Sequence, residues 1–97
     1  MTEQFSRWDS SEYLKTEEDM AEYLDACIEE AGDDPAFIAK ALGVIARARG
    51  MTQVARDSGL SRESLYRALS GEGNPEFGTI LKVIKALGLK LHAQAAH

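Results

Sequence analysis

The sequence predicts an all-α protein with a short strand added near its C-terminus. Through most of the chain, apolar residues recur at intervals of three and four, which places them on one face of an α-helix. Glycines follow three of these stretches, at Gly32, Gly59 and Gly88, where helices commonly end. By contrast, residues 89–92 alternate apolar and polar side chains, as a short strand does.

Length and composition limit the architecture. The chain has 97 residues, a length that suits one domain and is too short for two. Of these residues 44% are hydrophobic, which is enough to form a core. No apolar run approaches the ~20 residues that span a bilayer, and the first residues lack the apolar centre of a signal peptide. A single cysteine supplies neither a disulfide framework nor a metal cluster. We therefore expect one cytoplasmic domain, residues 1–97, with no cofactor and no metal.

Charge is divided along the chain. Residues 1–34 contain two basic and twelve acidic side chains, a balance of −10. Residues 35–97 contain nine basic and four acidic side chains, a balance of +5. The net charge of −5 therefore hides a basic second part that is compatible with DNA. The acidic first part must then face away from phosphate.

The first part, residues 1–33, is predicted to be an acidic helical extension. It begins with two apolar anchors, Phe5 and Trp8, followed by a short helix over residues 9–14. Tyr13 and Leu14 are expected to dock this short helix. Thr16 and Asp19 then have the spacing of a capping box, which starts a longer helix. The apolar stripe of this helix comprises Met20, Leu24, Cys27, Ile28 and Ala31. Cys27 is therefore expected to be a small buried hydrophobe.

The opposite face of that helix is acidic and comprises Glu18, Glu22, Asp25 and Glu29. Acids suit the start of a helix, but Glu29 and Glu30 lie at its negative end, where each like charge costs about 0.3–1 kcal/mol. Helix stability therefore does not explain the acidity. Two interpretations stay open, a solvated face and a docking surface for a basic protein.

The second part, residues 34–97, is predicted to be a helical core. Asp34 caps its first helix, and Pro35 takes the first helical position. The apolar face of this helix comprises Phe37, Ile38, Ala41, Leu42, Ile45 and Ala48. Arg47 and Arg49 close its last turn, where a structural role with the helix dipole and a phosphate contact are equally plausible. The last helix has an apolar stripe of Phe77, Ile80, Leu81, Ile84 and Leu87.

Residues 51–71 predict two short helices joined by a tight turn. Thr52 is the expected N-cap of the first helix and Ser61 of the second, and Gly59 between them tolerates a left-handed backbone. Ala55 is small enough for the two helices to approach closely. In the second helix, the inward residues are Leu65, Ala68 and Leu69, and the outward residues are Arg62, Glu63, Tyr66, Arg67 and Ser70.

This spacing resembles the helix-turn-helix of Xre/Cro-type repressors, in which the second helix lies in the DNA major groove. The alternative is an ordinary helical hairpin with a glycine cap. On the resemblance, the base-reading candidates are Arg62, Glu63, Ser64, Tyr66 and Arg67. The phosphate-contacting candidates are Thr52, Gln53, Ser61, Asn74 and Lys82. Glu63 equally suits a helix first turn, and Asn74 a loop cap. One recognition helix reads about half a site, so a homodimer is expected.

Nearly the whole chain, residues 5–92, resembles the HigA-like antidote proteins of chromosomal addiction modules, within the Xre/Cro-type family. The stretches RARGMTQVAR, GLSRESLYRALSG and GNP carry this resemblance. It implies a lambda-repressor-like domain that binds operator DNA in its own promoter. It also implies an antitoxin that neutralises a basic RelE/ParE-like toxin encoded beside it. The acidic helical face then supplies the toxin-binding candidates, Glu18, Glu22, Asp25 and Glu29.

Two other functions and one structural question complete the predictions. A stand-alone phage-type repressor would have the same helices and no toxin partner, with an acidic arm that solubilises or dimerises. An enzyme would need a nucleophile with a base, a metal set or paired carboxylates in a cleft. Cys27 lies among core positions, and His92 and His97 lie at the chain end, so no catalysis is expected. The strand 89–92 could pair with residues 5–8, with a second copy or with another protein.

Overall fold

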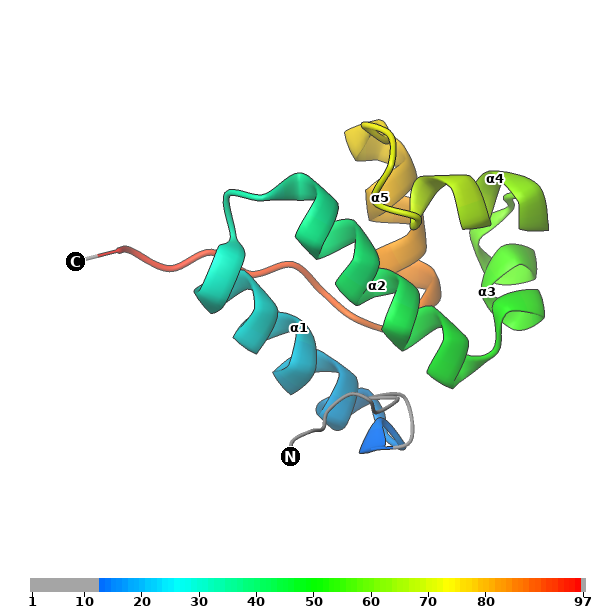
Figure 1. Ribbon diagram of the computed structural model, residues 1–97. Helices are drawn as coiled ribbons and strands as arrows, with labels where there is room; N and C mark the ends of the chain where they lie inside the picture. Colours follow the sequence, from blue (N-terminus) through cyan, green and yellow to red (C-terminus); the bar gives the residue numbers. More distant parts are fainter. Residues whose placement is uncertain (1–12, 97) are drawn as a thin grey trace, which may run out of the picture.

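The computed structural model describes residues 13–96, and this part of the chain is all-helical. Its helices are α1 (Glu17–Ala31), α2 (Pro35–Arg49), α3 (Met51–Ser58), α4 (Arg62–Ala68) and α5 (Phe77–Ala86) (Figure 1). The all-α prediction is confirmed for these residues. The expected anchors Phe5 and Trp8, and most of the predicted helix over residues 9–14, lie outside the described residues.

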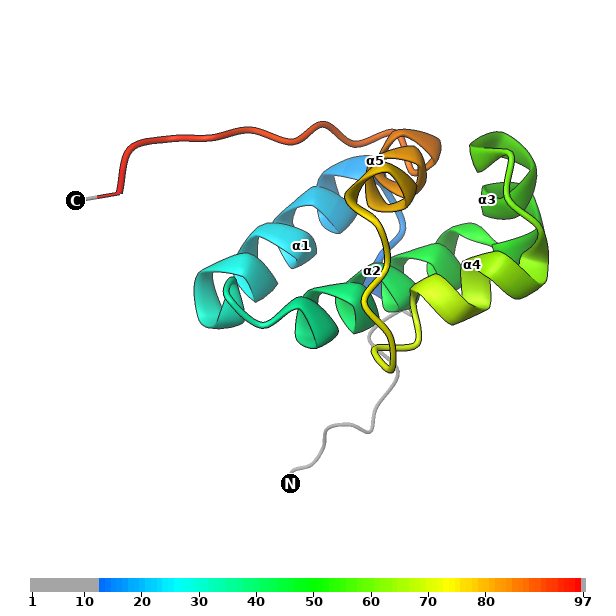
Figure 2. The same ribbon diagram turned by 90° about the horizontal axis from the view of Figure 1, so that it is seen from above.

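Helix α2 occupies the centre of the arrangement. Helix α1 packs along one side of it and α3 along the other, while α4 and α5 both pack against α3. Two views at right angles show α1 and the α3–α4 pair on opposite sides of α2 (Figures 1 and 2). The acidic helix therefore faces away from the pair predicted to contact DNA, as the division of charge required.

Most of the buried side chains form one cluster, to which helices α1 to α5 all contribute. Its largest fully buried members are Leu42, Ile45, Val54, Leu65, Val83 and Leu87. Each such side chain contributes about 1.5–3 kcal/mol when it leaves water. Met20 and Leu24 of α1 belong to the same cluster, so the acidic helix is part of the core. Cys27 is also buried, and burial raises the pKa of its thiol, so it behaves as the predicted hydrophobe.

The helix starts predicted at Thr16 and Asp34 are present in the structure. The Thr16 hydroxyl accepts from the Asp19 amide at 3.1 Å, and the Asp19 carboxylate accepts from the Thr16 amide at 3.1 Å, which completes the capping box. The Asp34 carboxylate accepts from the amides of Ala36 and Phe37 at 3.1 and 3.3 Å. These side chains satisfy amides that have no partner inside a helix.

Helix α2 is buried more widely than its apolar stripe predicts. Of the expected residues, Ala41, Leu42 and Ile45 are buried, Ile38 and Ala48 are partly buried, and Phe37 is exposed. Ala39, Gly43 and Ala46, which were not predicted, are also buried. A Cβ atom on Gly43 would lie 3.2 Å from the carbonyl oxygen of Leu69, so the missing side chain lets the end of α4 approach closely. A helix between two neighbours must present small residues to one of them, and hydrophobic periodicity does not reveal this.

The predicted strand at residues 89–92 is wrong, because the described part of the chain contains no strand. Gly88 has φ 78°, its amide donates to Lys85, and the Leu89 amide donates to the carbonyl of Ile84 at 3.1 Å. This is the Schellman arrangement that ends a helix, with Leu89 folded back onto the core. The alternation reflects that cap, whereas a strand needs a neighbouring strand to pair its backbone.

Candidate functional site

A single residue, Gly50, connects α2 to α3. Its backbone has φ 112° and ψ 110°, a conformation that side chains disfavour, and its amide donates to Ala46 at 2.8 Å. Helix α3 therefore starts at Met51, and Thr52 lies inside its first turn with an exposed side chain. The prediction that Thr52 is the N-cap is wrong, because the sharp corner at Gly50 begins the helix two residues earlier.

The turn between α3 and α4 is held by several hydrogen bonds. Gly59 is left-handed with φ 78°, as predicted, and the Leu60 amide donates to Ala55 at 3.1 Å. The Ser58 hydroxyl donates to the same Ala55 carbonyl at 3.2 Å and accepts from the Leu60 amide at 3.3 Å. Ser58 thus stabilises the turn with a polar side chain at a position where an apolar one would also pack.

Ser61 caps α4, as predicted. Its hydroxyl oxygen accepts from the Ser64 amide at 3.0 Å and donates to the Ser64 hydroxyl at 3.0 Å. Ser64 is half-buried, so this residue is less accessible than the other base-reading candidates. Leu65, Ala68 and Leu69 are buried, which confirms the predicted inward face.

The outward face of α4 consists of two ordered pairs. The Arg62 guanidinium donates to the Tyr66 hydroxyl at 3.2 Å and lies 5.7 Å from the centre of that ring. Arg67 donates to the Glu63 carboxylate at 3.3 Å, one helical turn away. All four side chains are exposed, which confirms their predicted outward direction. The face thus presents two guanidinium groups and a phenol on one short helix.

The phosphate-contacting candidates do not all gather beside α4. Thr52 and Gln53 are exposed on α3, where the Gln53 amide donates to Asp57 at 2.9 Å and its carbonyl accepts from Arg56 at 3.4 Å. Lys82 is exposed on α5. Asn74 instead lines an apolar groove with residues of α1 and α5.

The acidic face of α1 is outward, as predicted. Helix α1 carries seven acidic side chains and no lysine or arginine, and Glu18, Glu22, Asp25 and Glu29 are all exposed. Three of them, Glu22, Asp25 and Glu29, line a shallow depression against the extended C-terminal residues 89–94. Glu18 lines a different depression at the start of the helix. The four predicted toxin-binding candidates therefore lie in two separate depressions.

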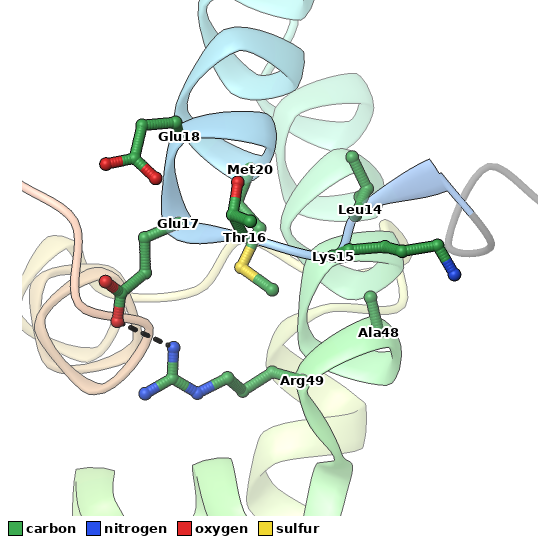
Figure 3. Close-up of a pocket in the computed structure, with 8 residues that line it drawn as sticks. All are labelled: Leu14, Lys15, Thr16, Glu17, Glu18, Met20, Ala48 and Arg49. Carbon is green, nitrogen blue, oxygen red and sulfur yellow. Dashed lines mark hydrogen bonds and ion pairs between the residues drawn. The ribbon is translucent and has the colours of Figure 1, made fainter.

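The depression that contains Glu18 is formed by the start of α1 and the end of α2 (Figure 3). Arg49 extends across it, and its Nη1 lies 3.1 Å from the Glu17 carboxylate and 3.3 Å from the carbonyl oxygen of Leu87. Of the two roles that the sequence left open for Arg49, the structure supports the structural one. Arg47 remains exposed on α2.

Neither metal-binding nor membrane-spanning features stand out in the described residues. Within residues 13–96, no three His, Cys, Asp or Glu side chains come together in a metal-ligating arrangement. The helices of this part are too short or too polar to cross a bilayer.

A family model described as "Probable addiction module antidote protein" matches residues 4–95. This chain belongs to that antidote family. A relative from Haemophilus influenzae, described as an uncharacterized protein, is 52% identical over 94 residues, which cover 97% of this chain and 95% of the relative. No solved structure matches the chain. The resemblance to antidote proteins is thus confirmed at the level of the family.

The region that the family model matches includes helices α1 to α5, the acidic α1 and the α3–α4 pair alike. The sequence did not predict one surface feature of this protein, the apolar groove between α1, α2 and α5. The apolar stripes of α1 and α5 were recognised, but their periodicity does not show which of their residues a neighbouring helix leaves uncovered. Phe77 and Ile28, predicted on those stripes, are exposed.

Proposed function

We propose that this protein is the antitoxin of a type II toxin–antitoxin module. In this proposal it neutralises a small basic toxin of the RelE/ParE-like type and represses its own operon through the α3–α4 pair. The observation that carries the proposal is the placement of an acidic helix and an arginine-bearing short helix on opposite sides of α2 within one antidote protein. Two partners of opposite charge could then bind at the same time.

The DNA-binding half rests on the outward face of α4. We propose that α3 and α4 form a helix-turn-helix of the Xre/Cro type in a lambda-repressor-like fold, with α4 in the major groove. Arg62 and Arg67 would fork onto guanine, and Glu63 would accept from cytosine. The Arg67–Glu63 pair is exposed on both sides, so opening it costs little. Two copies would bind two half-sites as a homodimer.

Phosphate contacts would hold this helix in the groove. Thr52 and Gln53 lie on the first turn of α3, where the helix also presents backbone amides. Helices α3, α4 and α5 together carry five basic and two acidic side chains, which favours a polyanion. Lys82 of α5 would contribute one of these contacts.

The toxin-binding half rests on the acidic face of α1. Within residues 13–96, Glu18, Glu22, Asp25 and Glu29 form no ion pair with another side chain. Among the described residues their charges therefore serve no pairing, and complementary charge would speed the association of a basic protein. The family description supports a toxin partner in general terms.

The other candidate function is a stand-alone phage-type repressor. It shares the α3–α4 pair, and only the absence of a toxin partner distinguishes it. Membership of the antidote family favours the antitoxin over the stand-alone repressor.

One co-purification experiment separates the two functions. The protein would carry an affinity tag and be co-expressed with the product of the adjacent reading frame. We expect that product to co-purify and its toxicity to disappear. A gel shift with the module's own promoter then tests repression. Promoter binding without any co-purified protein would favour the stand-alone repressor instead.

A further inference from the structure

An apolar groove of about 310 Å³ lies between the second half of α1, the start of α2 and the start of α5. Its walls include Leu24 and Ile28 from α1, Ile38 from α2 and Phe77 and Ile80 from α5. Leu91 of the extended C-terminal segment closes one side. The groove is thus assembled from segments that are distant in sequence.

Several of its large apolar side chains remain in water. Phe77 is 68% exposed, Leu91 50% and Ile28 41%. Single exposed apolar residues are normal on a protein surface, whereas a convergent set around a hollow marks an interaction site. Three such residues from three segments converge here, and nothing in the described chain covers them.

Carboxylates lie in the depression beside the groove and next in sequence to two of its lining residues. Asp25 and Glu29 line the adjoining depression, which shares Leu24, Ile28 and Leu91 with the groove. Asp33 directly follows the groove residue Gly32, and Glu76 directly precedes Phe77, and both are exposed. On the side of the C-terminal segment, Lys90 and His92 also line the depression. The surface along α1 and around the groove mouth is therefore apolar in the middle and acidic at its edge.

We propose that this groove binds an amphipathic helix of a basic partner protein. The apolar stripe of that helix would lie against Ile28, Phe77 and Leu91, and its flanking lysines and arginines would face Asp25, Glu29 and Glu76. The proposal rests on the proposed antitoxin function, because the basic partner is then the toxin. It adds that apolar anchors outside the acidic face of α1 hold the toxin.

The charges favour a basic partner over a second copy of this chain. In a two-fold dimer the same surface faces itself. A dimer through the groove would therefore gather the Asp25, Glu29 and Glu76 carboxylates of both copies in one interface, and like charges gathered there oppose association. A helix also suits the groove better than a strand, because most of its walls are helical side chains rather than free backbone edges.

The test measures binding of the purified adjacent gene product to the full-length wild type and to a Phe77→Ser, Leu91→Ser double variant. Both side chains are exposed, so the variant should fold and melt normally. We expect its affinity for the adjacent gene product to fall at least about tenfold, mainly through faster dissociation. Leu81→Ser is the matched control, since Leu81 is 40% exposed on the same helix but does not line the groove. It should bind within about twofold of wild type.

Promoter binding, melting and sedimentation of each protein are measured alongside. Equal capture by wild type and double variant would overturn the groove assignment and leave the antitoxin function standing. Failure of the wild type to bind the adjacent gene product would overturn both. A wild-type dimer that the double variant dissociates would also overturn the proposal, because the groove would then be a self-interface.

Discussion

The guanidinium of Arg49 lies 3.1 Å from a carboxylate oxygen of Glu17, which joins the end of α2 to the start of α1. The same nitrogen lies 3.3 Å from the carbonyl oxygen of Leu87, at the end of α5. Each charge suits its helix end, because anions are favoured at N-termini and cations at C-termini. One side chain therefore links three helices.

This link predicts unequal effects of two substitutions. Glu17→Gln removes a partly exposed ion pair and a favourable charge at the start of α1, and together these should cost about 1 kcal/mol of unfolding free energy. Arg49→Met also removes the bond to Leu87, which adds about 0.5–1.5 kcal/mol. Urea unfolding of both variants measures the difference. Equal losses would show that the bond to Leu87 contributes nothing. High salt should reduce the ion-pair part of both losses and leave the difference between them, which comes from the bond to Leu87.

The capping box of α1 predicts a dependence of stability on pH. Backbone amides of Lys15 and Thr16 donate to the Asp19 carboxylate at 3.1 Å and hold the pKa of Asp19 below its ordinary value of 3.8. A lowered pKa stabilises the fold above the ordinary value, and this contribution disappears as the pH falls through the lowered pKa. Thermal melts of wild type and Asp19→Asn should therefore differ at neutral pH and converge in strong acid. A constant gap in melting temperature would contradict the assignment.

The close approach of α3 and α4 predicts the effect of a larger residue at position 55. Ala55 is buried, and its carbonyl accepts three hydrogen bonds of the turn. Ala55→Leu should overpack the core and cost about 1–3 kcal/mol. Arg56→Leu adds the same side chain at the next, exposed position and should melt as the wild type does. If both variants melt alike, the two helices are not packed as closely as described.

The proposed DNA contacts predict two kinds of loss. Arg67→Ala should weaken promoter binding by about 1–3 kcal/mol if Arg67 forks onto a guanine, and only on the cognate sequence. Gln53→Ala should weaken binding evenly across sequences, because phosphate contacts carry no sequence information. Gel-shift titrations with promoter and scrambled DNA distinguish the two. Folded Arg62→Ala and Arg67→Ala proteins with unchanged affinity would contradict the proposed role of α4.

The acidic face of α1 predicts opposite outcomes for the two partners. Changing Glu18, Glu22, Asp25 and Glu29 to lysine should leave promoter binding intact or stronger, since repulsion from phosphate is removed. Binding of the adjacent gene product should become slower and lose its salt dependence. Titrations with each partner at low and high salt measure both effects. An unchanged salt response for the protein partner would mean that the face is only solvated.

Local signals in the sequence predicted most of the helices. Caps such as Thr16 and Asp34 and the glycine at position 59 act within a few residues, so their effects are visible in the sequence. The wrong cap at Thr52 arose because the corner at Gly50 depends on how α3 packs against α2. The strand prediction was wrong because Leu89 completes the cap of α5 and has no neighbouring strand to pair with among the described residues.

The candidate site was predicted less completely than the helices. The outward direction of Arg62, Tyr66 and Arg67 followed from helical periodicity alone, because it depends only on spacing. The exposure of Phe77 could not be predicted, since periodicity shows which residues share a face but not whether another helix covers it. Asn74 likewise lies on the groove because of how α1 and α5 converge.

The position of α1 across α2 from α3 and α4 gives the molecule a permanent electric dipole moment. Helix α1, with its seven acidic side chains, lies on one side of α2, and the helices that carry Arg56, Arg62 and Arg67 lie on the other. Near a polyanion, such a dipole experiences a torque that turns its positive pole inward before any contact forms. Collisions with DNA would then begin with α4 already foremost, so the rotational search is shortened even though the net charge is negative.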